Sequence, residues 1–230
     1  MREIVLDTET TGPDPKGDRI VEIGCVELYN HIRTGQTYHI YLNPERDMPD
    51  EAFRVHGLSG QFLADKPVFL NVVDALLDYL GDARLVAHNA EFDIAFLNAE
   101  LGRPGRPLIG MERVVDTLTL ARRRHPGQPN SLDALCSRYG IDNTKRTKHG
   151  ALVDAEILAD VYAELIGGRQ TSFGLITAES AAMQKRFRGA WQRPVPLSPR
   201  LTEQEALAHD AFIATLTSPI WNSYQAADAA

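Results

Sequence analysis

The sequence predicts an α/β fold, with a mixed five-stranded sheet flanked by helices and followed by a C-terminal linker and a short helical tail. Three segments rich in β-branched residues come first, and their short separations favour antiparallel strands. Short apolar strands then alternate with helical periodicity, which is typical of a sheet covered by helices on both faces. After Gly168 the composition shifts to scattered Gln, Arg and Pro, which indicates a linker.

The expected strands are short runs of apolar and β-branched residues bounded by turn-forming residues. They cover 4–8, 20–29, 37–42, 85–88 and 114–116. The stretches TGPDPKGD and NHIRTG separate the first three, which we therefore expect to be antiparallel neighbours.

The expected helices carry apolar residues three and four positions apart. They cover 71–80, 92–101, 118–124, 131–139 and 149–166. Ser131 is placed to cap the fourth helix, and Gly167 with Gly168 to end the fifth.

A helical tail is expected beyond the linker. Thr202 and Glu205 have the spacing of a capping box, which opens a helix to about Leu216. The apolar residues on one face of this helix are Ala208, Ala211, Phe212 and Leu216. Trp221 follows the helix. We therefore expect three parts, which are a globular domain over 1–169, a flexible linker over 170–200 and a tail over 201–230.

The charge balance excludes one class of protein. The 230 residues hold 24 Lys and Arg against 31 Asp and Glu, a formal net charge of −7, so a basic protein that binds by overall charge is excluded. Seven cations nevertheless gather in residues 121–150: Arg122, Arg123, Arg124, Arg138, Lys145, Arg146 and Lys148. This basic stretch is either a solvated face or a local field that attracts a phosphate backbone.

The two cysteines, Cys25 and Cys136, each lie in an apolar stretch. We expect buried thiols rather than a disulfide or a cysteine-bound zinc ion. The chain enters a strand pattern at once, and no apolar run reaches the roughly 18 residues of a membrane span. We therefore expect a soluble, cytoplasmic protein.

Two acids lie side by side on the first expected strand. Because side chains alternate along a strand, Asp7 and Glu9 point to one face, which Val5 shares. Burying two like charges is costly unless a cation or a proton offsets them. Taken alone, the pair is equally compatible with a solvated strand end.

Two more acids stand at helix positions that face a core. Asp93 precedes Phe96 by three residues, and Asp154 precedes Leu158 by four. His149 lies five residues before Asp154. Taken singly, each acid can be a helix-start residue and the histidine a capping or surface residue.

Together, the four carboxylates form the donor set that Mg²⁺ or Mn²⁺ prefers. Two such ions roughly 4 Å apart can orient a water and stabilise the leaving oxygen in phosphodiester hydrolysis. His149 is then available as the general base, because imidazole titrates near neutral pH. The spacing admits this geometry without establishing it.

Three motifs carry a family resemblance. DTETTG at 7–12, HNAEFD at 88–93 and HGALVD at 149–154 resemble, in this order, the motifs of the DEDDh 3′→5′ exonucleases. The resemblance covers about residues 3–168 and implies a ribonuclease-H-like fold with His149 as base. It also implies a set of metal-coordinating acids, which are Asp7, Glu9, Asp93 and Asp154.

Longer stretches resemble the proofreading subunits of bacterial DNA polymerase III: EAFRVHG at 51–57, the segment 130–162 and QTSFGL at 170–175. In that family the counterparts of Glu51 and His56 contact the terminal nucleotide, and Asn89 and Phe92 occupy substrate-side positions. The implied substrate contacts also include three of the acids, Asp7, Glu9 and Asp154. Without the resemblance, Glu51 and His56 are ordinary loop residues and Phe92 can belong to the core.

Two segments resemble partner-binding sequences. Gln170, Phe173 and Leu175 match the peptide by which this family docks on the sliding clamp, where a Gln and two apolar anchors enter a groove. The terminal helix and Trp221 resemble the tail that binds the alpha subunit of DNA polymerase III. A six-residue match also arises by chance, and the sequence leaves open whether a small third core subunit joins the complex.

The sequence therefore predicts a 3′→5′ exonuclease that removes mispaired nucleotides from a single-stranded or frayed DNA 3′ end during replication, at the nucleoid. It would use two Mg²⁺ ions, with Mn²⁺ as a substitute, and release nucleoside 5′-monophosphates. One alternative is a stand-alone DEDDh nuclease acting on RNA or repair intermediates, which would not need residues 171–230. The other is a catalytically silent adaptor between polymerase and clamp, which loss of a catalytic acid would favour.

Overall fold

The structure is a computed structural model that describes residues 1–144, 148–167 and 201–217. The chain divides into two compact units, Met1–Phe173 and Gly174–Ala230, and each is described by itself. The clamp-like peptide at 170–175, the expected linker and Trp221 all lie outside the described residues.

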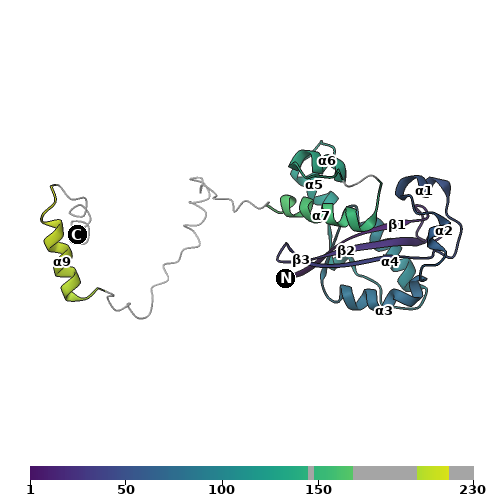
Figure 1. Ribbon diagram of the computed structural model, residues 1–230, viewed down its shortest axis with the longest axis horizontal. Coiled ribbons are helices and arrows are strands. Elements are labelled where there is room, and N and C mark those ends of the chain that lie inside the picture. The colour runs from purple at the N-terminus through teal and green to yellow at the C-terminus, as the bar shows by residue number, and fades with distance from the viewer. Residues whose placement is uncertain (145–147, 168–200, 218–230) are drawn as a thin grey trace. The chain divides into compact units, whose positions relative to one another are not determined.

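The first unit is built on a mixed five-stranded sheet in the order β3-β2-β1-β4-β5, of which Figure 1 labels β1, β2 and β3. The strands are β1 (Arg2–Thr10), β2 (Ile20–Tyr29), β3 (Ile32–Tyr41), β4 (Arg84–Ala87) and β5 (Val114–Asp116). β1 and β3 run antiparallel to β2, whereas β4 runs parallel to both β1 and β5. The predicted mixed sheet of five strands is confirmed.

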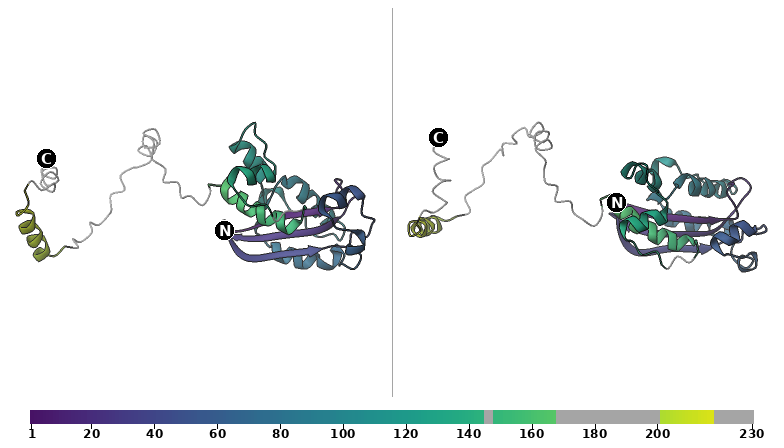
Figure 2. Two further views of the ribbon diagram at one scale, coloured as in Figure 1. Left: turned by 45° about the horizontal axis from the view of Figure 1, so that its top comes forward. Right: turned by 90° about the horizontal axis from the view of Figure 1, so that it is seen from above.

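Helices cover both faces of this sheet. The helical elements that the structure describes in this unit are α1 (Asp50–His56), α2 (Gly60–Leu63), α3 (Phe69–Leu80), α4 (Ala90–Gly102), the 3₁₀ turn η1 (Met111–Arg113), α5 (Thr117–Arg124), α6 (Leu132–Tyr139) and α7 (Ala151–Leu165). Figures 1 and 2 show α3 and α7 on opposite sides of the strands.

The alternation of β1 divides the core in two. Ile4 and Leu6 pack in the cluster that α3 and α4 complete, whereas Val5 between them packs in the cluster formed with α5, α6 and α7. Asp7 and Glu9 therefore share the α7 side of the sheet with Val5, as the alternation predicts, and Thr8 points to the α4 side.

The third strand begins earlier than predicted, at Ile32 instead of residue 37. Asn30 and His31 both adopt positive φ, 50° and 66°, so a two-residue turn joins β2 and β3 directly. β3 is an edge strand whose first six residues are exposed, so it lacks the apolar alternation on which the prediction depended.

Two short helices were not predicted. In α1 the one buried residue is His56, and α2 spans four residues, so neither produces an apolar periodicity. The five predicted helices of the first unit are present with ends shifted by at most two residues, and Ser131 caps α6 by accepting from the Ala134 amide. Cys25 and Cys136 are free, buried thiols, as expected.

The second unit contains the predicted tail helix as α9 (Glu203–Ile213). Its capping box is formed: the Glu205 amide donates to Thr202 Oγ1 and the Thr202 amide donates to Glu205 Oε2. The helix ends three residues before the expected Leu216, and Phe212 remains 60% exposed. None of the helices in the described ranges is long and apolar enough to cross a membrane.

Candidate active site

The site begins at the carboxyl end of β1. Asp7 and Glu9 project from this end toward α7, and Glu9 is buried. Open α/β sheets form their crevices beyond the carboxyl ends of parallel strands, and here the ends of β4 and β5 lie beside that of β1.

A glycine brings α7 to these acids. Gly24 pairs with Asp7 across β1 and β2, and a Cβ at Gly24 would lie 2.2 Å from the carbonyl carbon of Ala151 and from the amide nitrogen of Leu152. The first turn of α7 therefore passes directly over β2, and the same turn carries Asp154 to the β1 acids. Small buried residues keep the rest of the helix close to the sheet: Ala151, Ala155 and Ala159.

Asp93 reaches the same region from α4. Its side chain is 3% exposed, and Oδ1 accepts a hydrogen bond of 2.7 Å from Thr8 Oγ1. Burial raises the pKa of Asp93 to about 7, although the hydrogen bond from Thr8 acts in the opposite direction. A buried carboxyl held in this way is energetically unfavourable as an anion unless a cation lies next to it.

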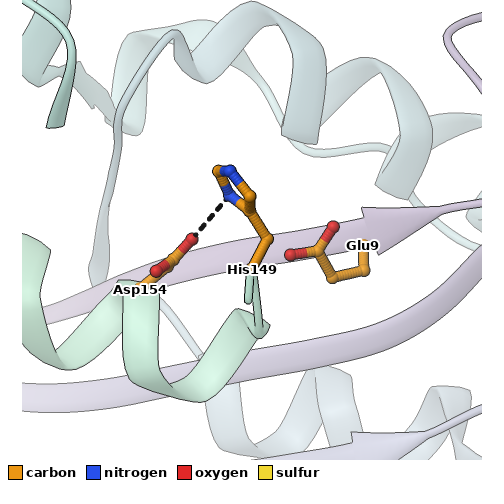
Figure 3. Close-up of side chains that lie close together, drawn as sticks. All are labelled: Glu9, His149 and Asp154. Carbon is orange, nitrogen blue, oxygen red and sulfur yellow. Dashed lines mark hydrogen bonds and ion pairs between the residues drawn. The ribbon is translucent and has the colours of Figure 1, made fainter. Parts of the chain in front are cut away.

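His149 lies close to two of the acids, Glu9 and Asp154. Its Nδ1 is 3.2 Å from Asp154 Oδ2, and one ligand atom from each of Glu9, His149 and Asp154 lies within 4.8 Å of the others (Figure 3). The imidazole is about half exposed, whereas both carboxylates are buried. Asp7 and Asp93 are not members of this triplet.

One cavity of about 860 Å³ nevertheless brings all the predicted acids and the histidine together. The predicted site residues on its wall are Asp7, Glu9, Asp93, Asp154, His149, Asn89 and Phe92. Clustered carboxylate oxygens match the preference of hard divalent cations, and a bound cation would offset the cost of burying the Asp93 carboxylate, whose pKa is raised by burial. The residues present therefore fit a Mg²⁺-type ion.

The two remaining predicted substrate contacts line a second cavity of about 470 Å³, which adjoins the first. Glu51 and His56 form part of its wall, and the two cavities share Thr8, Glu9 and Phe92. His56 Nδ1 accepts from the Leu58 amide at 3.0 Å, so the neutral ring carries its proton on Nε2. Burial lowers the pKa of His56.

Asp116 is a supporting residue that the sequence analysis missed. Its Oδ1 accepts from the amides of Asn89 and Leu118, each at 3.0 Å, and so caps the starts of both α4 and α5. Thr119 Oγ1 donates to Oδ2 at 2.6 Å. Asp followed by Thr at a strand end was a helix-cap signal for α5, but the bond to Asn89 crosses 27 residues and has no local signal.

Glu22 is a second missed acid. It pairs with Glu9 across β1 and β2, is buried, and lies 2.7 Å from His39 Nε2 through Oε1. The sequence feature that could have identified Glu22 was an acid within an otherwise apolar strand segment.

Comparisons with known proteins agree with this geometry. Residues 4–162 match the exonuclease family RNase_T. The DNA polymerase III subunit epsilon of Rickettsia prowazekii (strain Madrid E) is 52% identical over 226 residues, which cover 93% of this chain and 96% of that protein. The chain belongs to the DNA polymerase III epsilon subunit family. It is accordingly a 3′→5′ exonuclease that proofreads DNA replication.

Solved structures support the fold of this epsilon-family chain. Exonuclease X in complex with 5′ overhanging duplex DNA is 28% identical, with a TM-score of 0.56 over 71% of this chain and 90% of that one. The nuclease domain of 3′hExo, a DEDDh family member bound to rAMP, is 17% identical, with a TM-score of 0.61 over 72% of this chain and 91% of that one. The predicted ribonuclease-H-like fold is confirmed.

The extent of the epsilon match also bears on the alternatives. Because the match covers 93% of the chain, it includes residues beyond the nuclease fold. A stand-alone nuclease would not require these additional residues. The silent adaptor is disfavoured because the four acids and His149 line one cavity.

Proposed function

We propose that the exonuclease reaction takes place at the acids of the larger cavity, with divalent cations held by Asp7, Glu9, Asp93 and Asp154. Two Mg²⁺ ions are the expected occupants, with Mn²⁺ as a substitute. The observation that carries this proposal is the convergence of four carboxylates from β1, α4 and α7 on one cavity wall. Such ions, when bound, orient a water and stabilise the leaving oxygen of a phosphodiester.

His149 acts as the general base in this proposal. Its imidazole stands at the cavity wall, half exposed, with Nδ1 toward Asp154. That contact orients the ring and leaves Nε2 able to take a proton from the attacking water. Attack by this water breaks the bond between the phosphorus and the 3′ oxygen of the preceding nucleotide, which releases a nucleoside 5′-monophosphate.

The terminal nucleoside of a single-stranded or frayed DNA 3′ end occupies the smaller cavity. Glu51 and His56 line it, and Phe92 stands between the two cavities. Asn89, which adopts a positive φ of 67° at the start of α4, lies on the wall of the larger cavity. These residues contact substrate in this proposal, together with Asp7, Glu9 and Asp154.

Substitution of the acids and the histidine tests this assignment. Asp154→Asn should abolish hydrolysis of a single-stranded oligonucleotide, whereas Asp133→Asn should not, because Asp133 lines the same cavity from α6 without belonging to the acid set. His149→Ala should slow turnover by about 10²–10⁴-fold while Mn²⁺ affinity, measured by calorimetry, persists. Full activity in Asp154→Asn would contradict the metal assignment.

Because Glu9, His149 and Asp154 lie close enough to share an ion, the calorimetry also tests an alternative role for the histidine. Loss of Mn²⁺ affinity in His149→Ala in proportion to the loss of rate would identify His149 as a ligand and overturn its assignment as base.

The partners follow from the family. We propose that the tail binds the alpha subunit of DNA polymerase III and that Gln170, Phe173 and Leu175 bind the sliding clamp, which keeps the enzyme at the nucleoid during replication. The exposed apolar side chains of the tail support the first contact, Leu207 at 70% and Phe212 at 60%. A small third core subunit stays a prediction.

A further inference from the structure

Part of the wall of the larger cavity is formed by α5 and by the segment that leads into α6. It includes Leu118, Arg122, Gln128, Asn130 and Ser131. Of the described residues lining this cavity, Arg122 alone is a lysine or arginine, whereas five are acids. Among the residues that the structure describes, a phosphodiester strand that enters here therefore meets one permanent positive side chain.

The other cations of the basic stretch that the structure describes are engaged elsewhere or point away. Arg124 donates to the Leu165 carbonyl at 2.8 Å, and Arg138 donates to the Pro129 carbonyl at 2.9 Å. The Lys148 ammonium lies 5.3 Å from the centre of the Phe53 ring. Arg123 is exposed and does not line the cavity.

Arg122 differs from these neighbours. Its side chain is exposed and, within the described ranges, has no hydrogen-bond or ion-pair partner. Its charge acts within the cavity wall: burial is the main cause that lowers the pKa of His88, and the guanidinium of Arg122 acts in the same direction. Arg122 is thus a cation directed at the cavity with all its donors available.

The two cavities also set the direction of the strand. If the terminal nucleoside occupies the smaller cavity and the scissile phosphate lies at the acids, the rest of the strand must leave through the larger cavity. The next phosphate it carries there is the one on the 5′ side of the scissile phosphate. A guanidinium suits this group because its planar fork binds two phosphate oxygens at once.

We propose that Arg122 binds the phosphate on the 5′ side of the scissile phosphate and so makes the enzyme favour a strand over a single nucleotide ester. This inference rests on the proposed function, because it takes the acids as the place of cleavage. Arg122 contributes to substrate binding in this role and not to the chemical step.

The test uses three substrates with the full-length protein. They are an unmodified single-stranded oligonucleotide, the same oligonucleotide with a neutral methylphosphonate at the linkage 5′ to the scissile one, and the p-nitrophenyl ester of thymidine 5′-monophosphate. The last has no second phosphate. The variants are Arg122→Ala, Arg122→Lys and the matched control Arg123→Ala, which removes the same charge one residue away.

Arg122→Ala should raise KM for the unmodified oligonucleotide about tenfold with kcat nearly unchanged, because one charge-assisted contact is lost. On the methylphosphonate strand and on the nucleotide ester, Arg122→Ala should have the same KM and kcat as the wild-type protein. Arg122→Lys should restore part of the affinity, since a lysine keeps the charge but not the fork. Arg123→Ala should behave as wild type.

Three results would overturn the proposal. An equal rise in KM in Arg122→Ala and Arg123→Ala would mean that the positive charge acts as a diffuse electrostatic field. An equal rise in KM for Arg122→Ala on the charged and the neutral linkage would mean that Arg122 contacts another part of the substrate. Loss of activity on the nucleotide ester would place Arg122 in the chemical step. A failure of the proposed function is distinguishable, because Asp154→Asn would then retain activity whatever Arg122 does.

Discussion

Asp93 shows at the scale of one residue how the site opposes stability. Its carboxyl is buried against Thr8, and burial raises its pKa to about 7. Between pH 4 and 7 the folded state holds a proton that the unfolded state has released, so this group makes the free energy of unfolding fall as pH rises. The cost is fully present above pH 7, where the folded carboxyl must be charged.

We therefore expect Asp93→Asn to stabilise the metal-free protein at pH 8 by on the order of 2 kcal/mol, while it abolishes exonuclease activity. The stabilisation should shrink at pH 5, where the native carboxyl is already neutral. Urea unfolding in the presence of a chelator, at both pH values, measures the difference. A variant less stable than wild type at pH 8 would contradict the argument.

The thiols give a second prediction at this scale. Cys25 is fully buried, and burial raises its pKa, with the nearby charges of Asp93 and Asp7 adding to the effect. Cys136 is also buried. Because only an accessible thiolate reacts, we expect a thiol reagent to modify neither cysteine in the native protein and both after unfolding. Rapid native labelling of Cys25 would show that the strand opens.

At the scale of an element, α7 is the most consequential helix, because it carries Asp154 and follows His149 directly. It lies close to the sheet, since Gly24 leaves room for the backbone of its first turn. Asp116 has a related function for α4, whose start it caps from the end of β5. The backbones of two elements that carry predicted metal-binding acids are thus positioned by other residues, α7 by Gly24 and α4 by the Asp116 side chain.

Gly24→Ala tests the close approach of α7. The added methyl group must displace the helix backbone, so we expect a loss of about 1–3 kcal/mol in the free energy of unfolding. kcat should also fall, because Asp154 and His149 move with the helix. Gly102→Ala is the matched control, since a Cβ there has no neighbour within 4 Å. Equal kcat values for the two variants would contradict this account.

At the scale of the whole molecule, the described site residues all belong to the first unit, and none lies beyond Asp154. The second unit contributes a capped helix with exposed apolar side chains. Chemistry and partner binding are therefore expected to be separable by truncation.

We expect a protein ending at Gly167 to degrade single-stranded DNA at close to the full-length rate and to lose stable association with the alpha subunit. In the full-length chain, alanine at Gln170, Phe173 and Leu175 should weaken clamp binding alone, because two anchors on one chain act separately. Binding assays for each partner measure both effects. Undiminished polymerase binding by the truncated protein would show that the tail assignment is wrong.

Local sequence patterns determined which face of its strand or helix carries each of the four acids. Strand alternation placed Asp7 and Glu9 on one face with Val5, and helical spacing placed Asp93 and Asp154 toward the interior. Both periodicities depend on neighbouring residues alone, so they can be recognised without a fold. The edge strand β3 and the short helix α1 escaped prediction because they bury too little apolar surface to leave such a pattern.

Tertiary structure alone decided which side chains meet. The bond from Thr8 to Asp93 joins residues 85 positions apart, and the cap from Asp116 to Asn89 joins residues 27 apart. The position of Arg122 on the cavity wall, when Arg123 is not there, likewise depends on how α5 packs. The sequence determines which faces are apolar, but the contacts at the site depend on how those faces pack, because packing sets distances between residues that share no local pattern.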